Sequence, residues 1–293
     1  MEGYVSLFFT KRGRVTGKNM NQTLEKIYEQ LLAEMKEEED VLGAWDFGSA
    51  THGLSDEYSD VDVIFLVKGN AFQRMNEKLP AYMKSVCDEV ILCWPETFNN
   101  DAITNYGHLI KKGDEFLQFD VFLMNADQLD DFMCRLHYTD LKEENVLFDR
   151  TGDVRKLVQA APKGTLWSSG LKALNETYWF HVNMTIKYLK RQDFFKLNHL
   201  MRILMDTHVS VILTGYDRIQ WGGTANKLHF VPEEKRRHVM KYGCVEDFEV
   251  NRRNLLKEMS WFEEDYGDVC RIKGIPAQAE PAKTVKEIWN KQW

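Results

Sequence analysis

The sequence predicts an α+β fold in which a small mixed-sheet domain is followed by a helical bundle domain. In the first half of the chain, β-branched and aromatic runs of strand length alternate with Gly-containing turns. In the second half, apolar residues recur at helical spacing. The chain has 293 residues, of which 44% are hydrophobic and 28% charged, and this is enough for two globular domains.

The first helix is expected at residues 20–39, where apolar side chains such as Leu24, Ile27 and Leu31 recur at helical spacing. Residues 1–19 carry several basic side chains without any periodicity, and we interpret them as an extension outside the fold. After the helix, an apolar segment at 41–47 predicts the first strand.

The most informative segment begins where that strand ends, at Gly48 and Ser49, and continues to a β-branched run at 61–67 that predicts a second strand. A Gly-Ser turn between two strands supplies free backbone N–H groups and a hydroxyl. These groups suit the outer phosphates of a nucleotide, so Gly48 and Ser49 are candidate nucleotide-binding residues.

Asp60 and Asp62 lie at the start of the second strand. Because they are two residues apart, both side chains project from the same face. Two carboxylates facing one way on an otherwise apolar strand repel each other unless a cation bridges them. Oxygen ligands favour Mg²⁺ or Mn²⁺ over zinc. Asp56 and Glu57, in contrast, are interpreted as solvated turn residues.

A third acid is expected on a later hairpin, formed by strands at 106–110 and 116–124 around a Gly-containing turn. Asp120 interrupts the apolar second strand of this hairpin, and an unpaired buried carboxylate is costly. The alternative is an edge-strand Asp that points to solvent. Glu115 is a rival third acid, but it lies nearer the turn, so Asp120 is preferred.

The segment from Gly48 to Val67 resembles the Gly-Ser…Asp-x-Asp signature of the DNA polymerase β-like nucleotidyltransferase superfamily. Its short form looks most like the antibiotic nucleotidyltransferases that act on aminoglycosides or lincosamides. The resemblance implies a catalytic α/β domain followed by a helical domain, and a third carboxylate on a later strand of the same sheet. It does not specify the acceptor.

A triad of Asp60, Asp62 and Asp120 predicts two-metal chemistry, in which Mg²⁺ or Mn²⁺ ions clamp the α-phosphate of a nucleoside triphosphate. Asp120 is expected to act as a metal ligand, as the base for the acceptor hydroxyl, or as both. The sequence thus predicts an adenylyltransferase that moves AMP from ATP to a hydroxyl of a small molecule, with an aminoglycoside-type antibiotic as the leading acceptor and resistance to it as the biological outcome.

Two alternatives stay open: transfer to a lincosamide or a protein, and a non-catalytic nucleotide-binding or antitoxin-like module. Loss of one of the acids would favour the module. All three candidate acids are present, which favours an enzyme.

The catalytic domain is expected to end with a helix at 129–136 and a short strand at 145–149, and the Pro- and Gly-containing stretch that begins at Pro162 marks its end. We therefore place the nucleotidyltransferase domain at 20–162 and the helical domain at 163–293. Helices are predicted at 167–191, 197–213, 233–242 and 246–265, and a last short helix follows a link at 274–281.

The acceptor and the nucleotide are expected to contact the first of these helices, because small-molecule sites favour domain interfaces. Glu176 and Trp179 are candidate acceptor contacts, although an aromatic stripe at helical spacing is more often core. Lys187 and Lys190 are candidate triphosphate contacts on the strength of the resemblance, and solvated lysines are the alternative reading.

The net charge of −7 argues against a nucleic-acid partner, which would require a basic track, and favours a small cationic acceptor. The five cysteines are scattered and form no CxxC pair, so neither a disulfide framework nor a zinc site is predicted. No apolar run reaches the length of about 18 residues that a membrane span needs. We therefore expect a cytoplasmic protein without a membrane partner.

Overall fold

The computed structural model describes residues 21–52, 56–139, 141–162, 170–216, 228 and 231–293. The predicted extension at 1–19 lies outside the described residues. The chain divides into two compact units, residues 1–163 and 164–293, so the predicted boundary falls one residue before this division. Each unit is described by itself.

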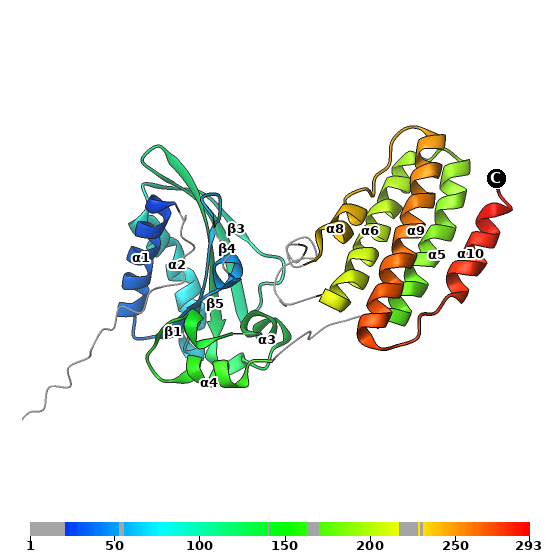
Figure 1. The fold of residues 1–293 in the computed structure, drawn as a ribbon. Helices are drawn as coiled ribbons and strands as arrows, with labels where there is room; N and C mark the ends of the chain where they lie inside the picture. Colours follow the sequence, from blue (N-terminus) through cyan, green and yellow to red (C-terminus); the bar gives the residue numbers. More distant parts are fainter. Residues whose placement is uncertain (1–20, 53–55, 140, 163–169, 217–227, 229–230) are drawn as a thin grey trace, which may run out of the picture. The chain divides into compact units, whose positions relative to one another are not determined.

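The first unit combines a sheet with helices and the second is helical (Figure 1). The first contains α1 (Gln22–Glu37), β1 (Val41–Asp46), η1 (Gly48–His52), β2 (Val61–Val67), η2 (Gly69–Ala71), α2 (Phe72–Val86), β3 (Glu89–Pro95), β4 (Ile103–Lys112), β5 (Glu115–Asn125), η3 (Ala126–Gln128), α3 (Phe132–Tyr138), η4 (Glu143–Asn145), β6 (Val146–Asp149) and α4 (Asp153–Ala160). The second contains α5 (Leu171–Lys190), α6 (Phe194–Tyr216), α8 (Glu233–Val239), α9 (Phe248–Lys273) and α10 (Glu280–Asn290).

Among the described residues, the strands form one six-stranded sheet in the order β3-β4-β5-β2-β1-β6. Strands β2 and β5 are parallel, whereas the other neighbours are antiparallel. The predicted fold class, a mixed sheet followed by a helical domain, is therefore confirmed. Strand β5 lies between β4 and β2, which excludes the reading of Asp120 as an edge-strand residue.

Each face of the sheet packs against its own hydrophobic core. On one face, residues such as Val63 and Val121 pack with the apolar sides of α1 and α2. On the other face, Ile64 and Phe122 pack with side chains of α3 and α4. Because side chains alternate along a strand, Asp62 and Asp120 point to the second face, the same face as Ile64 and Phe122. They lie near the N-terminal end of the paired segments, two residues before these apolar side chains.

Local capping explains where several helices begin. The Asn21 side chain accepts hydrogen bonds from the N–H groups of Thr23 and Leu24, so α1 begins at Gln22. Asp131 caps α3 in the same way, which moves this helix from the predicted 129–136 to Phe132–Tyr138. The residues directly after β5 form the short 3-10 helix η3, which precedes α3.

Three elements of the first unit, α2, β3 and α4, were not predicted. Helix α2 contains Pro80, a residue that reads as a helix breaker, yet its buried side chains at Met75, Leu79 and Met83 follow helical spacing. Strand β3 lies at the edge of the sheet and is largely exposed, so it lacks the buried apolar pattern that identifies a strand.

The second unit is built around aromatic side chains of α5 and α9. The rings of Tyr178 and Phe262 stack with centroids 3.5 Å apart, and the buried Trp179 packs edge-on against both. Helix α9 continues to Lys273, beyond the predicted end at 265, and stops at Gly274, whose φ of 66° suits a helix C-terminus.

A buried polar cluster joins α6, α8 and α9. The Asp265 carboxylate accepts hydrogen bonds from Lys235 at 2.6 Å, His208 at 2.9 Å and His238 at 3.0 Å. Burial alone would raise the pKa of Asp265, but these donors lower it to about 2. The cluster thus holds the short helix α8 against its two long neighbours.

No helix among the described residues is long and apolar enough to cross a membrane.

Candidate metal and nucleotide site

Four polar side chains occupy one face of the sheet where β2 begins. In the parallel pairing of β2 with β5, Asp62 is the direct partner of Asp120. Extending this register by two residues places Asp60 opposite Gln118. Of the three acids predicted from sequence, Asp62 and Asp120 therefore lie on neighbouring strands and face the same side of the sheet, and Asp60 lies directly before β2 in register with that side.

Two glycines make room for the carboxylates. A Cβ atom on Gly48 would lie 1.9 Å from Asp62 Oδ2, and Gly48 has a φ of +66°, which a side chain rarely adopts. On the other side, a Cβ on Gly107 of β4 would lie 2.9 Å from Asp120 Oδ1. Gly48 is therefore required by both its backbone conformation and the position of the Asp62 carboxylate, whereas a side chain at Gly107 would displace the Asp120 carboxylate oxygen.

The carboxylates are held in an electrostatically unfavourable arrangement. Burial raises the pKa of Asp62 well above its usual value, and the charges of Asp60 and Asp120 raise it further. The pKa of Asp120 is also raised, first by burial and then by the charges of Asp60 and Glu96, although a hydrogen bond from Gln118 opposes this. Among the described residues, none of these three acids forms an ion pair with a Lys or Arg side chain, so a bound cation would relieve their repulsion.

Gln118 supplies the hydrogen-bond donor within the group. Its Nε2 donates to Asp60 Oδ2 at 3.1 Å and to Asp120 Oδ2 at 3.0 Å. Within the described part of the chain, no three His, Cys, Asp or Glu side chains are already arranged to ligate a single metal ion. The oxygens of Asp60 and Asp120 instead converge on the Gln118 amide.

The residues nonetheless fit a divalent cation. Their donor atoms are all carboxylate oxygens, the type that Mg²⁺ and Mn²⁺ prefer. The raised pKa values of Asp62 and Asp120 indicate that a positive charge would stabilise both ionised groups. Asp60, Asp62 and Asp120 are therefore the residues that would hold such an ion.

The predicted phosphate-binding turn lies beside this group. Residues 48–52 form the 3-10 turn η1, closed by a hydrogen bond from Thr51 Oγ1 to the Gly48 carbonyl at 2.8 Å. The Phe47 N–H donates to the Asp62 carbonyl at 3.1 Å, which ties the start of the turn to β2. Ser49 is partly buried. The structure therefore brings Gly48 and Ser49 next to Asp62.

Glu115, the rival third acid, lies away from this group. It begins β5, five residues before Asp120, and accepts hydrogen bonds from Asn21 and Thr23 at the start of α1, each at 2.7 Å. These bonds lower the pKa of Glu115. Glu115 therefore binds the start of α1 and is not part of the group of acids. Asp120 is the acid that faces Asp62.

In the helical unit, Glu176 and Trp179 line one cavity of about 640 Å³ between α5 and the start of α10, together with Phe180. Glu176 is exposed and pairs with Lys172 at 3.9 Å, whereas Trp179 is almost wholly buried. The burial of Trp179 agrees with the alternative reading of this residue as core. Its role as an acceptor contact stays a prediction.

The two candidate lysines lie at the other end of α5. Lys187 is exposed, with its Nζ 4.8 Å from the centroid of the neighbouring Tyr188 ring. Lys190 donates to Gln292 and lies 5.4 Å from the centroid of the Trp293 ring. The 11 positions from Glu176 to Lys187 correspond to about 16 Å of helix. The structure therefore does not bring the lysines together with Glu176, and their role stays a prediction.

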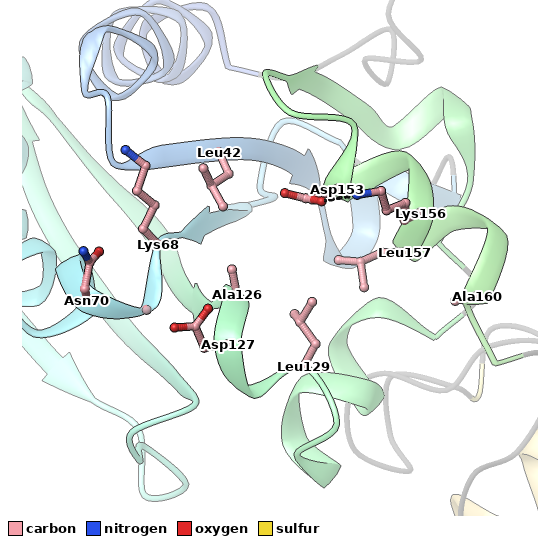
Figure 2. Close-up of a pocket in the computed structure, with 11 residues that line it drawn as sticks. Leu42, Lys68, Asn70, Ala126, Asp127, Leu129, Asp153, Lys156, Leu157 and Ala160 are labelled. Carbon is pink, nitrogen blue, oxygen red and sulfur yellow. Dashed lines mark hydrogen bonds and ion pairs between the residues drawn. The ribbon is translucent and has the colours of Figure 1, made fainter.

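A further cavity of about 590 Å³ lies at the opposite end of the parallel strands (Figure 2). Its lining comes from β1, from the turns after β2 and β5, and from α4, with an apolar floor that includes Leu42 and Leu157. Asp153 and Lys156 on its rim pair with each other at 2.7 Å. The carboxylate group is at the start of β2, about 17 Å along the strand from its end, so this cavity is separate from the candidate site.

Neither a protein-family model nor a curated protein matches the sequence. Among solved structures, the chain is similar to the crystal structure of an aminoglycoside 6-adenyltransferase from Bacillus subtilis. The two share 12% identity with a TM-score of 0.39, over 92% of this chain and 99% of the other. The likeness is a distant one.

Sequence reasoning missed Gln118, Gly107 and Glu96. Glycine inside a strand often marks a close approach of another group, so Gly107 carried a usable signal. The sequence carries no signal for Gln118, because its position opposite Asp60 becomes clear only when the register of β2 and β5 is known.

Proposed function

We propose that this protein is a Mg²⁺-dependent nucleotidyltransferase that moves AMP from ATP to a hydroxyl group of a small molecule. The observation that carries the proposal is the direct pairing of Asp62 with Asp120, with Asp60 on the same face and the Gly48–Ser49 turn alongside. Three acids gathered beside a glycine turn have a clear use in binding a cation and a phosphate chain, and they are otherwise costly.

Each residue has a part in the proposed reaction. The carboxylates of Asp60, Asp62 and Asp120 would hold Mg²⁺, and the bound ion would neutralise charge on the phosphates. The N–H groups and hydroxyl of the Gly48–Ser49 turn orient the outer phosphates. Asp120, whose pKa is raised, accepts the proton of the acceptor hydroxyl. The hydroxyl oxygen then bonds to the α-phosphorus, while the bond from that phosphorus to the bridging oxygen breaks and pyrophosphate leaves.

For the acceptor, we propose a polycationic molecule of the aminoglycoside type. The acidic excess of the chain and the gathering of acids around Asp60 create a field that attracts cations. In the helical unit, exposed Glu176 offers a carboxylate for an acceptor amine beside the cavity that Trp179 lines. Lys187 and Lys190 are proposed as triphosphate contacts.

The proposal is tested by incubating the protein with Mg²⁺ and each of ATP, GTP, CTP and UTP against a panel of antibiotics. Mass spectrometry should find an aminoglycoside that has gained one nucleoside monophosphate, with ATP as the best donor. An adduct on a lincosamide or on a protein would replace the proposed acceptor and keep the reaction. No adduct with any donor would favour a non-catalytic nucleotide-binding module.

A further inference from the structure

Gln118 is the residue around which the two outermost acids of the site are organised. Its amide nitrogen donates to one oxygen of Asp60 and one oxygen of Asp120, at 3.1 Å and 3.0 Å. The one amide group thus bridges a carboxylate directly before β2 and a carboxylate on β5. Since β5 pairs with β2 in parallel, this geometry follows from the position of Gln118 opposite Asp60.

The bridge has an electrostatic role. When both are ionised, Asp60 and Asp120 carry like charges, and like charges at close range repel each other. In the described part of the chain, neither carboxylate forms an ion pair with a Lys or Arg side chain. The amide therefore supplies a hydrogen-bond donor between the two carboxylates.

A neutral amide has different consequences from a lysine at this place. A lysine would neutralise the acids and exclude a second positive charge, whereas an amide leaves their full negative charge available. Each carboxylate oxygen also has two acceptor sites, so an oxygen that accepts from Gln118 retains one for a metal ion. The Asp60 and Asp120 oxygens are therefore held near the same amide nitrogen, and each can still coordinate a metal ion.

We propose that Gln118 is a positioning residue for the divalent cation, which holds Asp60 and Asp120 in place before the ion binds and remains hydrogen-bonded to them afterwards. Hydrogen bonds to metal-ligating carboxylates typically change metal affinity by about 10- to 100-fold when they are removed. The inference rests on the proposed function only in that these acids bind a cation.

The test is a Mn²⁺ titration without nucleotide, in which the electron paramagnetic resonance signal measures the concentration of the free ion. Gln118→Leu removes both donors at similar volume and should weaken Mn²⁺ binding by about 10-fold or more. Gln73→Leu is the matched control, because Gln73 lies on the exposed side of α2 and its amide donates to Glu77, away from the three acids. This variant should bind Mn²⁺ like the parent. Circular dichroism confirms that both variants are folded.

The outcomes separate this inference from the proposed function. If the parent binds Mn²⁺, Asp62→Asn does not, and Gln118→Leu binds as tightly as the parent, then the metal site stands and the role of Gln118 is overturned. Tighter binding by Gln118→Leu would also overturn it, since the amide would then be a competitor of the ion. If the parent itself binds no Mn²⁺, both the inference and the proposed metal site fail.

Discussion

Asp62 on β2 and Asp120 on β5 are direct partners across the parallel pair of strands in the sheet. Parallel neighbours lie about 4.8 Å apart, so the two carboxylates share one face at short range. Burial raises the pKa of Asp62, and the charges of Asp60 and Asp120 raise it further. An arrangement that disfavours its own ionised form is typical of a site that binds a cation.

The first prediction concerns Gly48, which supports the Asp62 carboxylate. Gly48→Ala should abolish Mn²⁺ binding and turnover, because the new Cβ would lie 1.9 Å from Asp62 Oδ2 and displace it. Gly113→Ala is the control, since Gly113 also has a positive φ but nothing lies within 4 Å of its Cβ position. That variant should lose only about 1–2 kcal/mol of stability through backbone strain and keep its metal affinity. Equal Mn²⁺ affinities in the two variants would refute the role of Gly48.

The second prediction concerns the hydroxyl of Ser49. Ser49→Ala should weaken binding of a non-hydrolysable ATP analogue by about 1–3 kcal/mol, the usual contribution of a hydrogen bond to a charged group. Isothermal titration calorimetry measures the change. Ser85→Ala, which removes an exposed hydroxyl on α2, should leave nucleotide affinity as it is. Unchanged affinity in Ser49→Ala would reduce Ser49 to a residue that only forms the turn.

The third prediction concerns Glu258, a wholly buried acid of α9. Both of its carboxylate oxygens lack a hydrogen-bond partner among the described residues, and burial raises its pKa to about 8. A carboxyl whose folded pKa is raised stabilises the protein fully below its unfolded pKa, near 4.5, and this contribution is lost as the pH rises through about 8.

At pH 9, Glu258→Gln should therefore have a higher melting temperature than the parent, and its free energy of unfolding should be greater by on the order of a few kcal/mol. At pH 5 the two proteins should have nearly equal stability. The control is Glu264→Gln, which changes an exposed acid of the same helix. Melting curves of the three proteins between pH 5 and pH 9 decide the point. A parent whose stability is flat over this range would show that Glu258 is not buried as an acid.

The fourth prediction concerns the charge of the acceptor. If the acceptor is polycationic, its KM should rise steeply between low and physiological salt, where the Debye length falls to about 8 Å. Glu176→Gln should raise KM at low salt and reduce the dependence on salt. The measurement is acceptor KM against ionic strength at saturating ATP and Mg²⁺. A KM that is insensitive to salt would remove the aminoglycoside proposal and favour a lincosamide or protein acceptor.

The sequence allowed the acids of the site to be predicted because strand periodicity is local. Asp60 directly precedes β2 and Asp62 lies on it, two residues further on, so their shared face follows from the sequence. Asp120 could be chosen because it interrupts an apolar strand. Gln118 and Gly107 could not be assigned, since their roles depend on the register between strands that are far apart in the sequence.

The ends of the sheet were harder to predict. Strand β3 is an exposed edge strand without a buried face, so it lacks the apolar pattern of a strand. Helix α2 was not predicted because Pro80, a residue that usually ends a helix, lies inside it. In the helical unit, the pattern around Trp179 identified a helix, but periodicity alone does not distinguish a core aromatic residue from a ligand contact. Its burial against Tyr178 and Phe262 emerges only from the packing of α5 on α9.

The most direct test of nucleotidyl transfer by the three acids is to compare the turnover of Asp62→Asn with that of the parent. Pyrophosphate release and nucleotide transfer to the best acceptor are measured together at saturating ATP and Mg²⁺. We expect the variant to remain folded, with a melting temperature in the absence of metal at least equal to that of the parent, because a repelling charge has been removed. We also expect both products to fall below detection. A folded Asp62→Asn protein that retains near-parental transfer would contradict the assignment of this site.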